Sequence, residues 1–89
     1  MPDTLEVADP TGLPNDHLRA LWYLAHDDWD ESHRLCQIGE DSLSCWIHAH
    51  LHRVEGDLGN AGYWYRRAGM APRTDELPTE FADLVRTAG

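Results

Sequence analysis

One short turn, Gly56-Asp57, separates two segments that both have the periodicity of amphipathic helices. Glycine at position 56 suits the left-handed conformation that often follows the last turn of a helix. The Asp57 carboxylate can then accept hydrogen bonds from the free amides of the next helix. The apolar positions recur at helical spacing on both sides of the turn; they are Leu43, Ile47, Leu51 and Val54 before it, and Leu58, Ala61, Tyr65 and Ala68 after it. The sequence therefore predicts an αα-hairpin over residues 42–69.

A similar arrangement precedes this hairpin, over residues 14–38. Pro14 suits the first turn of a helix, and Asp27-Asp28 interrupts the periodicity. Asp28 followed by Glu31 resembles a capping box. The inward positions are Leu18, Leu21, Trp22 and Ala25 on the first helix, and Trp29, Ser32, His33 and Cys36 on the second. We expect a first αα-hairpin here, with its turn about 29 residues before that of the second.

The ends of the chain complete the predicted architecture. Residues 1–13 are acidic and proline-containing, which predicts an N-terminal acidic arm that either lies over the surface or is disordered. Residues 78–88 carry apolar positions at helical spacing and predict a capping helix. The fold class expected is all-α: two stacked antiparallel helical hairpins and a C-terminal capping helix, forming a single helical domain over residues 14–89 without a strand.

Composition limits the classes of partner. The formal net charge is -9, which argues against nucleic acid and against anionic membrane surfaces, because both require basic residues. No apolar run approaches the roughly 20 residues that span a bilayer. Two cysteines do not form a disulfide framework, so a reduced, cytoplasmic setting is expected.

The second hairpin resembles a tetratricopeptide or Sel1-like repeat. The residues that carry the resemblance are Gly56-Asp57, Ala61, Tyr65, Ala68 and Pro72. This resemblance implies a protein-interaction scaffold built from stacked helical hairpins. The string from His48 to Gly69 also resembles a segment of short bacterial proteins, a likeness that implies no reaction.

The histidines at positions 48, 50 and 52 suggest a metal site, but a helix cannot direct all three at one ion. His48 and His52 share a face, whereas His50 lies near the edge of the apolar face. The version compatible with a helix uses His48, His52 and Glu55, at positions i, i+4 and i+7, to bind zinc or a similar divalent metal. A ligand from another helix would complete it; the candidates are His17, His26 and Asp16. The alternative is that these side chains pack against the capping helix or face solvent, with no cofactor.

A second candidate site is a polar and aromatic patch near the hairpin turn. An arginine beside an indole can bind a carboxylate of a protein partner. Its members are Arg53, Asp57, Asn60, Trp64 and Arg67. The alternative is an intramolecular network that pairs Arg53 or Arg67 with Asp57, with Glu55 or with acidic residues of the N-terminal arm. Association of the chain with itself is a further possibility, because two hairpins leave a helix face to cover.

Nucleophilic catalysis has less support. Cys36 falls on the core stripe, where thiols are usually inert. Cys45 has only His48 nearby as a base, and the sequence lacks phosphate-binding, serine-hydrolase and HExxH motifs. The sequence therefore favours a small protein-interaction or adaptor module over an enzyme. The alternative is a small metal- or ligand-binding protein, including an enzyme, that uses His48, His52 and Glu55.

Overall fold

The computed structural model describes Leu5 and residues 7–89, and this part of the chain is helical without a strand. The prediction of an all-α fold is therefore confirmed. The α-helices are α1 (Asp16–Ala25), α2 (Trp29–Ile38), α3 (Ser42–Val54), α4 (Leu58–Arg67) and α5 (Leu77–Ala88), and a short 3-10 helix, η2, spans Pro10–Gly12. None of these helices combines the length and apolar character needed to cross a membrane.

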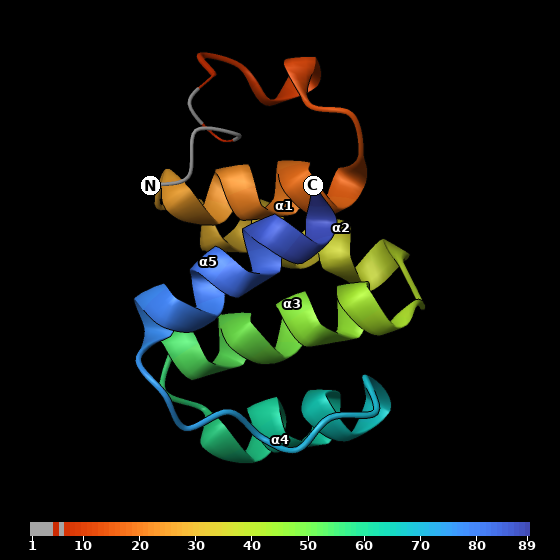
Figure 1. Ribbon diagram of the computed structural model, residues 1–89, viewed down its shortest axis with the longest axis vertical. Coiled ribbons are helices and arrows are strands. Elements are labelled where there is room, and N and C mark those ends of the chain that lie inside the picture. The colour runs from red at the N-terminus through yellow and green to blue at the C-terminus, as the bar shows by residue number, and fades with distance from the viewer. Residues whose placement is uncertain (1–4, 6) are drawn as a thin grey trace.

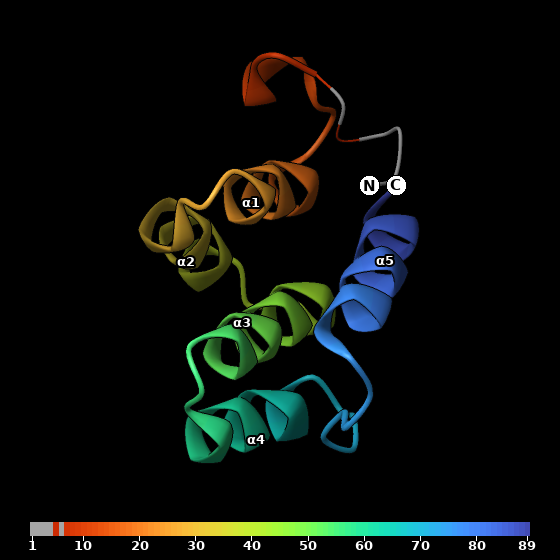
Figure 2. The same ribbon diagram turned by 90° about the vertical axis from the view of Figure 1, so that its left-hand side faces the viewer.

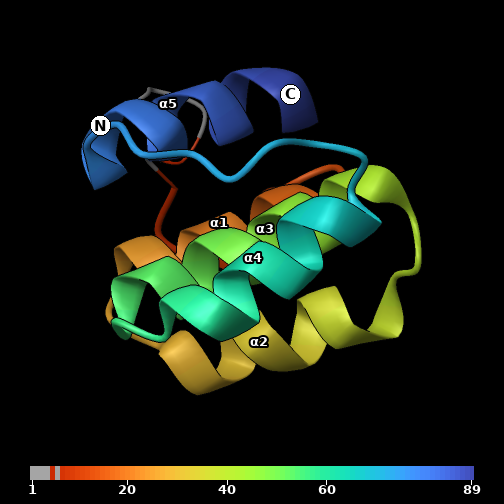
Figure 3. The same ribbon diagram turned by 90° about the horizontal axis from the view of Figure 1, so that it is seen from below.

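The helices form a zigzag stack in the order α1, α2, α3, α4, and α5 lies along its side (Figures 1 and 2). Helix α3 is central, because it contacts α1, α2, α4 and α5. Seen from below, the connection after α4 runs back alongside α4 to the start of α5 (Figure 3). This arrangement sets α2 against α3, which brings side chains of the two hairpins together.

Both helix reversals occur where the sequence predicts them. Gly56 has a φ of 85°, and the Asp57 carboxylate accepts a hydrogen bond from the backbone N–H of Asn60 at 3.2 Å. In the first hairpin Asp27 takes the left-handed position, with a φ of 63°, and Asp28 caps α2. The side chain of Glu31 bonds to Arg34, so only the Asp28 half of the predicted capping box is formed.

The Gly56 turn allows a matched pair of glycine substitutions. Gly56→Ala should destabilise the protein by about 1–2 kcal/mol, because an L-residue at positive φ is strained. Gly62→Ala should stabilise it by about 0.5–1 kcal/mol, because alanine favours the interior of a helix. A Cβ at position 62 would lie 3.7 Å from Arg66 Nη1, an ordinary contact. Urea unfolding measures the free energy of unfolding of each variant. Equal changes of the same sign in the two variants would contradict the turn geometry.

The apolar core lies where α1, α3 and α5 meet, and the N-terminal arm contributes to it. Leu5 and Leu13 are 1% and 4% exposed, and Trp22 Nε1 donates to the Val7 carbonyl at 3.0 Å. Of the two alternatives for the arm, the described residues show one that lies against α1. Residues 1–4 and 6 of the predicted arm lie outside the described residues. The other core residues are Leu18, Ala20, Leu21, Cys36, Ile47, Leu51, Leu84, Val85 and Ala88.

Candidate metal centre

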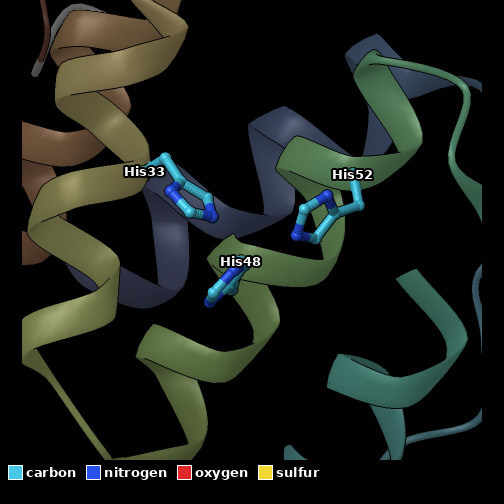
Figure 4. A group of neighbouring side chains, drawn as sticks. All are labelled: His33, His48 and His52. Carbon is cyan, nitrogen blue, oxygen red and sulfur yellow. The ribbon is translucent and has the colours of Figure 1, made fainter. Parts of the chain in front are cut away.

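Three histidine side chains meet where α2 packs on α3. His33 comes from α2, and His48 and His52 come from α3 (Figure 4). One ring nitrogen of each lies within 4.8 Å of those of the other two. The ring centroids are 4.5 Å apart for His33 and His48, 4.9 Å for His48 and His52, and 5.5 Å for His33 and His52. We call these three residues the histidine triad.

Helix geometry and helix packing position the triad. His48 and His52 are one helical turn apart, so their rings lie on the same face of α3. They are 3% and 6% exposed, whereas His33 is half-buried. His33 joins them because the inward face of α2 packs on α3. The triad therefore spans the junction between the two hairpins.

Two tryptophans hold the rings in place. Trp29 stacks on His33 at 4.7 Å between ring centroids, and its indole N–H donates to the Leu51 carbonyl at 2.8 Å. Trp64 stacks on His48 at 3.8 Å. Because ring stacking restricts rotation about the side-chain bonds, the triad is preorganised by aromatic contacts from α2 and α4.

The orientation of His52 is set by a carboxylate. His52 Nδ1 lies 2.6 Å from Glu55 Oε1, so Nδ1 carries the proton that it donates to the carboxylate. The Nε2 lone pair then remains available for a metal ion. A histidine ligand whose second nitrogen donates to a carboxylate is the usual arrangement in metal sites, where it fixes the tautomer and raises the basicity of the ring.

The surroundings favour neutral imidazoles. Burial, together with the nearby His33, His52 and Arg67, lowers the pKa of His48 to about 4. Burial also lowers the pKa of His33, as does His52, while Glu55 and Asp30 oppose that shift. His33 and His48 are therefore neutral at neutral pH, and neutral imidazole is the form that binds metal.

The structure brings together only part of the predicted metal set. His48 and His52 lie side by side, but Glu55 contacts the far nitrogen of His52 instead of joining the triad. The three candidates for an additional ligand have other neighbours: His17 Nε2 lies 2.9 Å from Asp41, His26 stacks on Trp22, and Asp16 accepts from Arg19. His33 lies beside His48 and His52 instead. The sequence places His33 on the inward face of its helix, but its approach to α3 depends on how the two hairpins pack.

His50 is bound to a buried carboxylate that is not among the site residues predicted from the sequence. Glu80 of α5 is 0% exposed, and His50 Nδ1 donates to its Oε1 at 2.6 Å. Other donors from α3 and α4 complete this Glu80 network: Trp46 Nε1 at 2.9 Å, Arg53 Nη1 at 2.8 Å and the Tyr65 hydroxyl. The sequence does carry a signal, because Glu80 falls on the apolar stripe of α5 between Leu77 and Leu84.

The donors to Glu80 outweigh the cost of burying its charge. Burial by itself would raise the pKa of Glu80, but hydrogen bonds from His50, Tyr65 and Trp46 lower it to about 2. The carboxylate is therefore ionised at neutral pH. It attaches α5 to α3 and α4 by charge-assisted hydrogen bonds, which are stronger than neutral ones.

The predicted partner-binding patch is divided into three parts. Arg53 faces α5 and is bound to Glu80, as in the intramolecular alternative but with a different acidic partner. Asp57 and Asn60 bond to each other at the start of α4. Trp64 stacks on His48 of the triad. The Arg67 guanidinium lies over the Trp64 ring, 5.1 Å from the ring centroid. Only Trp64 and Arg67 therefore remain adjacent as an aromatic and cationic pair.

The cysteines are both buried. Burial raises the pKa of the Cys36 thiol to about 12, which agrees with the prediction of an inert core thiol. His48, the base considered for Cys45, instead packs on Trp64. The described residues hold two groups of potential metal ligands: the histidine triad, whose members are all buried or half-buried, and His52, Glu55 and Asp57, of which the last two are exposed. The triad is therefore the better candidate for a metal site.

Comparison with known proteins adds no assignment. No protein-family model, curated protein or solved structure matches the chain. The resemblance to tetratricopeptide and Sel1-like repeats therefore stays a prediction, and the function must be argued from the site itself.

Proposed function

We propose that this protein is a small helical module that binds a divalent transition metal, with zinc the leading candidate, through His33, His48 and His52. The observation that carries the proposal is the convergence of three imidazole nitrogens, from two different helices, within 4.8 Å of one another. Ligand nitrogens around a tetrahedral zinc lie about 2.0–2.1 Å from the metal. Small side-chain movements would therefore bring the three nitrogens to bonding distance.

The ligand type supports this choice of metal. Imidazole suits zinc, copper and nickel, whereas magnesium and calcium prefer oxygen. The triad contains nitrogen donors alone, and the Glu55 carboxylate acts behind His52 in the manner common to zinc-bound histidines. The site therefore favours a borderline transition metal over a hard cation.

Metal binding by untagged protein tests the proposal. After treatment with a chelator, the protein should bind one zinc ion per chain in a titration against a chromophoric competitor. His33→Asn should lower the zinc affinity at least ~10-fold, the smallest loss expected even for an outer-shell change at such a site. His26→Asn is the matched control, because His26 is exposed and stacks on Trp22 away from the triad.

The His33 variant separates a built site from incidental binding. Two histidines one turn apart on a helix can bind nickel or zinc by themselves. Such binding would use only His48 and His52 and would be unchanged in His33→Asn. Equal zinc affinity in the wild type and His33→Asn, or no stoichiometric zinc in the wild type, would contradict the proposal.

A second candidate function, a tetratricopeptide-like interaction module, is supported by the exposed end of α4. Arg67 lies over the rings of Trp64 and Tyr63 at 5.1 and 5.9 Å, and its guanidinium is exposed. A partner carboxylate could bind there, and a second copy of the chain is one such partner. Analytical sedimentation would measure association of the chain with itself. A protein partner captured by the wild type should be lost with Arg67→Ala and kept with Arg66→Ala, the matched control.

A further inference from the structure

We infer that the metal ion held by the histidine triad keeps one open coordination position, which binds water or a small monovalent anion. The inference rests on the proposed function, because it concerns the same site. It goes further by assigning the site to the exchangeable class of metal centre instead of the closed, structural class.

Ligand number is the first argument. Structural zinc sites use four protein ligands, whereas catalytic sites use three and leave the fourth position to water or substrate. In Leu5 and residues 7–89, no fourth histidine, cysteine or acidic side chain offers an atom that lies within 4.8 Å of all three triad nitrogens. Glu55, the nearest acidic candidate by sequence, is bound to His52 Nδ1. The described residues thus supply three ligands to this position and no fourth.

Charge is the second argument. A divalent cation bound by three neutral imidazoles keeps its full double positive charge, since none of these ligands is anionic. An open position on such an ion favours anions over neutral ligands. The Glu55 carboxylate offsets the charge of the ion only indirectly, because it contacts His52 Nδ1 and does not reach the metal position itself. Small anions that coordinate metals, such as azide, thiocyanate and hydroxide, therefore match the site.

Access is the third argument, and it limits the size of the ligand. His48 and His52 are almost fully buried, and Trp64 covers His48. His33 is half-buried and is the most exposed of the three triad residues, and Trp29 stacks on its ring. The open position should therefore admit a small ion or water more readily than a large substrate.

Cobalt-substituted protein tests the inference, because the visible absorption of Co²⁺ reports its coordination. The stoichiometric cobalt complex should change its spectrum with added azide, and the change should saturate as one anion binds. Perchlorate at the same ionic strength is the control, because it does not coordinate, and it should change nothing. His26→Asn, loaded with cobalt, should respond to azide as the wild type does.

The outcomes separate the two proposals. If cobalt fails to bind in stoichiometric amount, the proposed metal function is wrong. If cobalt binds but azide and thiocyanate leave its spectrum unchanged, the metal site stands and the open position is wrong. A spectral response that perchlorate reproduces would also overturn the open position, since it would reflect ionic strength instead of coordination.

Discussion

Replacing Glu80 by alanine is expected to destabilise the protein by about 3–5 kcal/mol, the usual cost of removing one partner of a buried ion pair. The substitution would remove a carboxylate that is 0% exposed and leave its donors without an acceptor; they are Trp46, His50, Arg53 and Tyr65. Domains of this kind have about 0.05–0.15 kcal/mol of stability per residue, so the loss is a large part of the total. Urea unfolding followed by tryptophan fluorescence measures it.

Glu76→Ala is the matched control for the Glu80 substitution. Glu76 precedes α5 by one residue, is exposed, and makes no side-chain capping hydrogen bond. Its replacement should change stability by less than ~0.5 kcal/mol. Glu80→Gln keeps the shape of the side chain but loses the charge, and should fall between the two. Similar stabilities for Glu80→Ala and Glu76→Ala would show that the network does not hold α5 in place.

The pH dependence of stability gives a second readout of the same network. The pKa of Glu80 is lowered to about 2 in the folded protein, below its ordinary value of 4.5. The ionised carboxylate therefore contributes stability above about pH 4.5, and this contribution is lost as the pH falls from there towards 2. The wild type should lose more stability than Glu80→Gln across this range. Parallel curves for the two proteins would contradict the lowered pKa.

The hairpins could be predicted from sequence because their signals are local. Gly56-Asp57 combines a residue that tolerates positive φ with a capping carboxylate, and both act within one turn of chain. Asp27-Asp28 works in the same way, with aspartate in the left-handed position. Such positions need no knowledge of the neighbouring helices.

The candidate site could be predicted only in part, because its members come from separate helices. The i, i+4 spacing of His48 and His52 is visible in the sequence, whereas the approach of His33 depends on the packing of α2 against α3. Arg53 and His50 have the same property, since both bind Glu80, which lies on α5. A polar side chain on the apolar stripe of a helix indicates that the side chain is buried. It does not indicate which residue of another helix it binds.

Zinc is expected to raise the melting temperature of the wild-type protein by about 10–20 °C when it is present at about 100 times its dissociation constant. A ligand that binds only the folded state at this excess contributes about 2.7 kcal/mol, and each kcal/mol shifts the melting temperature of a domain this small by about 4–8 °C. Differential scanning calorimetry in zinc and in chelator measures the difference. The chelator should return the melting temperature to its metal-free value.

The distribution of the ligands makes this stabilisation specific to His33. With all three histidines, a bound metal would link α2 of the first hairpin to α3 of the second, so unfolding of either hairpin would have to release it. In His33→Asn the remaining pair lies within α3, and a metal there would stabilise one helix without joining the hairpins. Zinc should therefore raise the melting temperature of His33→Asn far less than that of the wild type, while His26→Asn should show the full rise. An equal rise in His33→Asn would mean that the metal does not bridge the two helices.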